Sequence, residues 1–107
     1  MTEFVTVTTT TDDRAAAERI ARAAVERRLG ACARIMPVQS VYRWKGEICD
    51  AAEFSVEIKT TASRRGLLEA TIRELHPYEL PEIVVHPILD GSPDYLAWLS
   101  AETAGDS

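Results

Sequence analysis

Two long segments with strand-like composition, joined by a short turn, constrain the fold of this chain most strongly. The first, Ala31 to Gly46, carries no helix signal, and Pro37 within it predicts an edge strand or a bulge. In the second, Glu47 to Thr61, apolar and polar residues alternate from Phe54 to Lys59, which is typical of a strand with one buried face. Lys45-Gly46 predicts the turn between them. Arms of about ten residues, or ~33 Å, would overhang a compact body, so we expect another subunit to cover their exposed edge.

The first thirty or so residues predict a strand followed by a helix. Phe4 to Thr9 is rich in β-branched residues, which favour a strand. From Arg14 to Leu29 apolar and polar residues recur at helical spacing. The polar residues at 11–13 are N-cap candidates, and Gly30 is expected at the position that ends the helix.

The second half predicts a helix, a short strand and a final helix. Ser63 is the expected N-cap of the first of these helices, which ends at Leu75 because His76 precedes a proline. The segment 81–88 predicts a short strand between prolines, and Ser92-Pro93 predicts the start of the last helix.

The resulting order, β-α-β-β-α-β-α, predicts an α+β fold of the ferredoxin-like plait type with an extra C-terminal helix. We expect one domain over residues 1–107. One face of the predicted sheet has no helix of its own, and the last helix is apolar over most of its circumference. Both features predict an oligomer.

Composition narrows the class of function. The net charge of -5 argues against nucleic acid or an anionic membrane as partner. No apolar run is long enough to span a membrane and the N-terminus shows no signal-peptide pattern, so we expect a cytoplasmic protein. Cys32 and Cys49 form no metal-binding spacing, and we favour free thiols over a disulfide.

The segment His76-Pro77-Tyr78-Glu79-Leu80-Pro81-Glu82 holds the densest cluster of polar groups. An imidazole with nearby carboxylates suits copper or zinc, whereas the prolines indicate a rigid connecting loop; on the local sequence alone we favour the rigid loop. Cys32 lies in a predicted strand, where packing is a more common role than ligation. We find no nucleophile–base pair or catalytic motif, so we expect no enzymatic activity.

Five motifs, in order along the chain from Val5 to Trp98, resemble those of the CutA divalent-cation tolerance protein family. They are Ala31-Cys32-Ala33 after Leu29-Gly30; Ser40-Val41-Tyr42-Arg43-Trp44-Lys45-Gly46; Glu53 followed by Ile58-Lys59-Thr60; the His76–Glu82 segment; and Tyr95-Leu96-Ala97-Trp98. The resemblance implies the ferredoxin-like plait and a homotrimer in which the long hairpin extends an intersubunit sheet. It also implies a response to metal ions, with no agreed enzymatic activity.

The resemblance implies two candidate sites. Copper-binding members place a cysteine and a second histidine where this chain has Thr8 and Leu75. We therefore expect only weak copper or zinc binding near His76, with Glu79 or Cys32 from the same or a neighbouring chain as further ligands. The alternative is a signalling or scaffold trimer like the PII proteins, whose intersubunit cleft binds a small anionic metabolite or a protein segment. Its expected cleft residues are Tyr42, Trp44, Lys59, Tyr78 and Glu82, with Lys59 as the anion contact.

Overall fold

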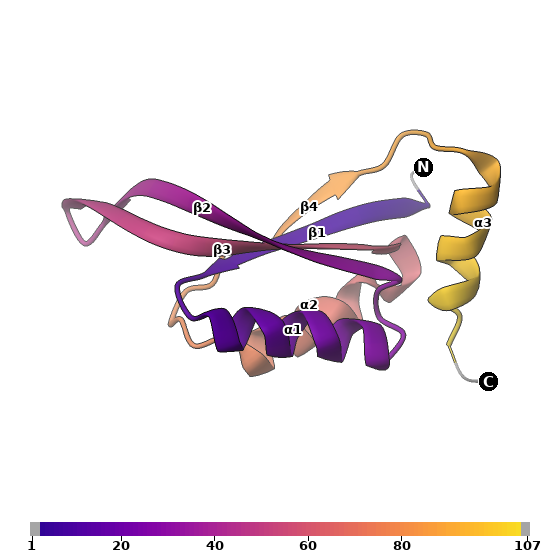
Figure 1. The fold of residues 1–107 in the computed structure, drawn as a ribbon, viewed down its shortest axis with the longest axis horizontal. Coiled ribbons are helices and arrows are strands. Elements are labelled where there is room, and N and C mark those ends of the chain that lie inside the picture. The colour runs from indigo at the N-terminus through magenta and orange to yellow at the C-terminus, as the bar shows by residue number, and fades with distance from the viewer. Residues whose placement is uncertain (1–2, 106–107) are drawn as a thin grey trace.

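The computed structural model describes residues 3–105 and shows a four-stranded antiparallel sheet with three α-helices. The sheet order is β2-β3-β1-β4, and Figure 1 shows helices α1 and α2 side by side on one face. The predicted α+β architecture is confirmed. In chain order the elements are β1 (Phe4–Thr11), α1 (Arg14–Glu26), β2 (Cys32–Trp44), β3 (Glu47–Thr61), the 3₁₀ turn η1 (Ala62–Arg64), α2 (Arg65–Leu75), β4 (Val84–Pro87) and α3 (Pro93–Glu102).

The core lies between the sheet and the two helices. Alternate residues of β1 and β3 face the helices because side chains of a strand point to opposite faces in turn. Alanines on α1 keep this helix close to the sheet. The buried cluster consists of Val5, Val7, Ala17, Ile20, Ala24, Leu29, Val56, Ile58, Leu68 and Ile72.

The β2–β3 hairpin is the longest feature of the molecule. Its register is continuous from the pair Cys32–Lys59 to the pair Trp44–Glu47, and it runs past Pro37 without a bulge. Lys45 and Gly46 both have positive φ, 50° and 83°, as a two-residue type I′ turn requires. The hairpin projects well beyond the helical layer (Figure 1), and β2 is an edge strand, as its proline predicts.

Helix α1 ends earlier than predicted and without using Gly30. The left-handed residue is Arg28, with φ 57°. Its N–H donates to Val25 O over 3.1 Å, and the Leu29 N–H donates to Ala24 O over 2.9 Å. This pair of bonds is a Schellman motif, which closes the helix at Glu26. Gly30 instead lies buried against β3, where a side chain would meet Ile58.

Three other expected boundaries also differ. β1 continues to Thr11 rather than Thr9, because it pairs with β3 as far as Phe54. Ser63 does not cap α2: it lies within η1, and its hydroxyl is 3.2 Å from that of Thr61. β4 covers only Val84–Pro87. By contrast, Asp13 caps α1 as expected, since its carboxylate accepts from the Ala15 N–H over 3.0 Å.

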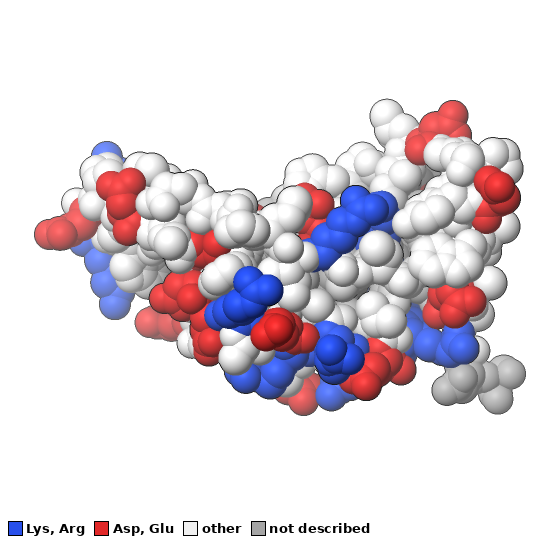
Figure 2. Space-filling model, viewed as in Figure 1, with Lys and Arg blue, Asp and Glu red and all other residues white. Residues whose placement is uncertain are grey.

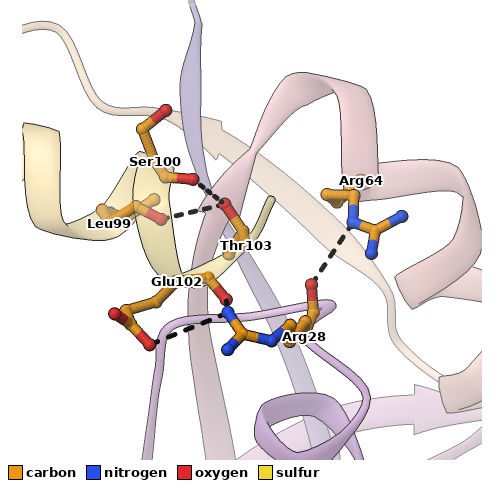
Figure 3. A network of polar contacts seen from close by, with 6 residues as sticks. All are labelled: Arg28, Arg64, Leu99, Ser100, Glu102 and Thr103. Carbon is orange, nitrogen blue, oxygen red and sulfur yellow. Dashed lines mark hydrogen bonds and ion pairs between the residues drawn. The ribbon is translucent and has the colours of Figure 1, made fainter. Parts of the chain in front are cut away.

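Helix α3 lies across the end of the sheet far from the hairpin tip, held by a polar network at its C-terminus (Figure 3). The Arg28 guanidinium donates to Glu102 O over 3.2 Å, which places a cation at the negative end of the helix dipole. Arg64 in turn donates to Arg28 O over 3.3 Å. The Thr103 hydroxyl donates to Leu99 O over 2.9 Å. The strained Arg28 thereby ties α3 to the loop between α1 and β2.

Candidate functional site

The loop after α2 begins at His76, whose imidazole is fixed by two backbone groups. Pro77 disfavours helical backbone at His76, which is extended with ψ 133°. The ring is nine-tenths buried, and Nε2 lies 2.7 Å from Thr10 O. The Tyr78 N–H points at Nδ1 over 3.1 Å. Because a carbonyl can only accept and an N–H can only donate, Nε2 carries the proton and Nδ1 accepts.

Tyr78 joins this loop to the hairpin and to the end of β1. Its hydroxyl donates to Glu53 Oε2 over 2.6 Å and accepts from the Asp12 N–H over 2.8 Å. Burial, and then the hydrogen bond to Glu53, raise the pKa of Tyr78 well above its usual value. The phenol, protonated at neutral pH as an ordinary tyrosine is, holds Glu53 as the acceptor of its hydrogen bond.

A pocket of about 760 Å³ opens between this loop and the hairpin. It is lined by Thr10, Ser40, Val41, Tyr42, Trp44, Glu53, Tyr78, Glu79, Leu80, Pro81 and Glu82. Glu53 lies on the face of β3 opposite Val56 and Ile58, so the pocket adjoins the face of the sheet without helices. The Thr10 hydroxyl donates to Glu82 Oε1 over 3.3 Å, which positions this carboxylate in the pocket lining.

The structure brings together most of the residues predicted for the cleft. Tyr42, Trp44, Tyr78 and Glu82 all line the one pocket. Their place in a cleft between subunits stays a prediction. Desolvation is the main cause that raises the pKa of Tyr42 above its usual value, and the proximity of Cys49 and Glu53 adds to it. The sequence interpretation missed Glu53 as a pocket residue, because no local signal links this strand position to the His76–Glu82 loop.

Lys59 does not line this pocket. It lies six residues further along β3 than Glu53, and its ammonium group contacts Tyr95 of α3, with Nζ 3.4 Å from the hydroxyl. An anion in this pocket would therefore not reach Lys59 of the same chain. Lys59 was expected to contact an anion in the same pocket as Tyr42, Trp44, Tyr78 and Glu82. Within one chain it does not lie in that pocket.

The predicted metal ligands do not converge within one chain either. Glu79 lines the pocket. Cys32 of β2 lies opposite Lys59 of β3. Thr10 of β1, which is hydrogen-bonded to His76, lies opposite Ser55 of β3. Four residues of β3 separate the two positions, about 13 Å. Across residues 3–105 no three His, Cys, Asp or Glu side chains lie close enough to hold a metal ion. His76, Glu79 and Cys32 of one chain thus do not fit a shared copper or zinc ion.

The two cysteines are free, as favoured from the sequence. Cys32 pairs with Lys59 and Cys49 with Tyr42, so ten residues of β3 separate the two positions. That is about 33 Å, whereas a disulfide needs Cα atoms within about 7 Å. None of the helices in the described part of the chain has the length and apolar character needed to cross a membrane.

Comparisons with known proteins agree with this architecture. The divalent-cation tolerance protein CutA of Thermus thermophilus is 41% identical over 104 residues, 96% of this chain and 99% of that one. The human protein CutA is 40% identical over 94 residues, 85% of this chain but 52% of its own length. The crystal structure of CutA from Xylella fastidiosa superposes with a TM-score of 0.92 at 35% identity, covering 95% of this chain and 99% of that chain.

Solved relatives also include an archaeal protein from Archaeoglobus fulgidus, described as a periplasmic divalent cation tolerance protein CutA. It is 30% identical, with a TM-score of 0.91 over 94% of this chain and 99% of its own. The CutA1 divalent ion tolerance protein family matches residues 5–102, nearly the whole chain. This chain therefore belongs to the CutA1 divalent ion tolerance family.

Proposed function

We propose that this chain supports divalent-cation tolerance without catalysing a reaction, by binding a small ligand in the pocket between the hairpin and the His76–Glu82 loop. The family descriptions name tolerance and no enzymatic activity. His76 has both ring nitrogens engaged with backbone groups, so acting as a general base would break one of these bonds. A binding role needs no such rearrangement.

One observation carries this proposal: hydrogen bonds within the chain fix the pocket wall before any ligand arrives. Glu53 from β3, Tyr78 from the loop and the backbone of Asp12 are joined by hydrogen bonds of 2.6 and 2.8 Å. A wall held by its own hydrogen bonds loses little conformational entropy on binding. This is the arrangement expected of a ligand site, and a loop that only connects two elements does not require it.

Growth under metal stress tests the proposal. In a bacterial strain lacking its own CutA gene, we expect the unmodified chain to restore growth in excess copper or zinc. Ser40→Phe, which fills the pocket, is expected to restore none. Gln39→Phe is the matched control, because Gln39 is exposed on the opposite face of β2. No restoration by the unmodified chain, or full restoration by Ser40→Phe, would contradict the proposal.

Weak copper or zinc binding is a second candidate. Three carboxylates, those of Glu53, Glu79 and Glu82, line the same pocket. Carboxylates alone hold these metals less tightly than imidazole or thiolate, and recruiting His76 would break a buried hydrogen bond. We therefore infer that any such binding by one chain is weak.

We further propose that the chain forms a cytoplasmic homotrimer. The hairpin leaves apolar side chains in solvent: Val41 and Ile48 are 66% and 61% exposed and share one face by register. Figure 2 shows acidic and basic side chains mixed over the helical side, whereas the edge between the hairpin and α3 is mostly uncharged. Exposed apolar surface of this kind is typical of contacts between subunits.

Light scattering tests the assembly. We expect a mass near that of three chains of 11.8 kDa each. Ile48→Asp, at the tip of the hairpin, is expected to shift the mass towards one chain by placing a charge in the contact. Leu67→Asp is the control, since Leu67 is equally apolar and 56% exposed but lies on α2. A folded monomer of the unmodified chain would refute the trimer.

A further inference from the structure

Glu53 is a buried carboxylate without a cation. The residue is 5% exposed, and its only hydrogen bond within residues 3–105 is the one that Oε2 accepts from Tyr78. None of the ion pairs in the described part of the chain includes it. Oε1 has no partner there, but it is not among the fully buried unpaired atoms, so solvent reaches it. Buried charges are normally paired, and a ligand in the pocket that Glu53 lines could supply the missing charge.

The pocket as a whole favours a positively charged ligand. Its charged side chains are the three carboxylates of Glu53, Glu79 and Glu82, and its lining contains no lysine or arginine. An anionic metabolite, the alternative ligand that the family resemblance implied, would meet like charge on the pocket wall. A cation would meet opposite charge, in a site where Glu53 is largely buried but keeps Oε1 accessible.

The lining also distinguishes an organic cation from a metal ion. No three potential metal ligands converge in the described residues. Instead Tyr42, Trp44 and Tyr78 contribute aromatic rings, beside the apolar side chain of Leu80. The ammonium group of Lys45 lies 5.6 Å from the centroid of the Trp44 ring, so Trp44 already has a cation partner within the chain, and the uncharged body of a ligand would lie along this ring. The volume suits a molecule with an apolar body as well as a charged group.

We propose that this pocket binds a small organic cation, an inference that rests on the proposed function. Its ammonium or guanidinium group would bind Oε1 of Glu53. Its apolar or aromatic body would lie along Tyr42, Trp44 and Leu80. Tyr78 is a positioning residue in this arrangement, because its hydroxyl holds Oε2 and leaves Oε1 available.

Isothermal titration calorimetry of the 107-residue chain with benzylamine and with benzyl alcohol tests the ligand class. The two probes have similar shape, but only benzylamine is charged at neutral pH. We expect benzylamine to bind about tenfold more tightly than benzyl alcohol, the discrimination typical of a charged hydrogen bond. Agmatine, which carries a guanidinium group, is expected to bind as well.

Glu53→Gln tests the anchoring residue. Glutamine keeps the size and an oxygen that accepts from Tyr78, but it removes the charge. We expect it to weaken benzylamine binding about tenfold and leave benzyl alcohol unchanged. Glu57→Gln, on the same strand and the same face but outside the pocket, is expected to change neither. Matching thermal unfolding midpoints would show that both variants fold.

Three results would overturn the inference. They are equal affinity for benzylamine and benzyl alcohol, equal effects of Glu53→Gln and Glu57→Gln, and no heat with either cationic probe. The two probes are compared on the unmodified protein, whereas the second comparison uses the two variants. A folding defect in Glu53→Gln would therefore leave the comparison of the probes intact. The growth test with Ser40→Phe decides separately whether the pocket serves metal tolerance, so either proposal can fail alone.

Discussion

Gly30→Ala is expected to lower the free energy of unfolding by about 2–3 kcal/mol, at the upper end of what overpacking a core costs. Gly30 is buried, and an added Cβ would overlap the γ2 methyl of Ile58. Ile58 is fully buried and β-branched, so it has few alternative rotamers. The backbone cannot retreat either, because the adjacent Ala31 N–H donates to Lys59 O over 2.9 Å. Relief would require α1 and β3 to move apart.

Chemical denaturation at one fixed protein concentration measures this effect, since assembly would make stability depend on concentration. Gly66→Ala is the matched control. Gly66 lies in α2, and a Cβ there meets no atom within 4 Å. Alanine at that position is expected to stabilise the protein by no more than about 0.5 kcal/mol, because Gly66 lies in the first turn of the helix and the full propensity difference applies to a helix interior. A Gly30→Ala variant as stable as the unmodified chain would show that the contact with Ile58 is easily relieved.

Gly30 also illustrates which parts of the fold were predictable from sequence. The hairpin was predictable because strand alternation and the Lys45-Gly46 turn are local signals. The end of α1 was not, because a glycine after a helix usually fills the left-handed position. Here Arg28 takes that position, and its side chain also binds the end of α3. The glycine was needed for close packing on Ile58, a contact that depends on tertiary structure.

The candidate site, too, was only partly predictable from the sequence. The loop from His76 to Glu82 was visible as a cluster of polar groups within seven residues. Glu53 could not be assigned to it, because it lies 25 positions before Tyr78 and only the folded hairpin brings the two together. Lys59 shares a strand face with Glu53, so the sequence pattern could not tell which of them lines the pocket. The two residues differ in their position along β3, which only the structure relates to the pocket.

His76→Ala is expected to lower the free energy of unfolding of the metal-free protein by about 3 kcal/mol, the cost of leaving buried polar groups unpaired. The substitution removes the partners of Thr10 O and of the Tyr78 N–H. It also removes a ring that packs edge-on against Tyr78 at 4.8 Å. His86→Ala is the control, because His86 is exposed on β4 and its loss is expected to cost under about 0.5 kcal/mol.

Titrating copper(II) and zinc(II) into the same chelator-treated proteins separates a structural role from ligation. If His76 serves the fold, metal affinity is weak in the unmodified chain, with a dissociation constant above about 10 μM, and His76→Ala changes it less than about threefold. If His76 is a metal ligand, the unmodified chain binds at micromolar concentrations or tighter and His76→Ala abolishes binding. We expect the first result, because neither ring nitrogen can bind a metal without losing a backbone partner. The second result would mean that the loop rearranges when metal binds, and that a neighbouring chain supplies the ligands that one chain does not bring together.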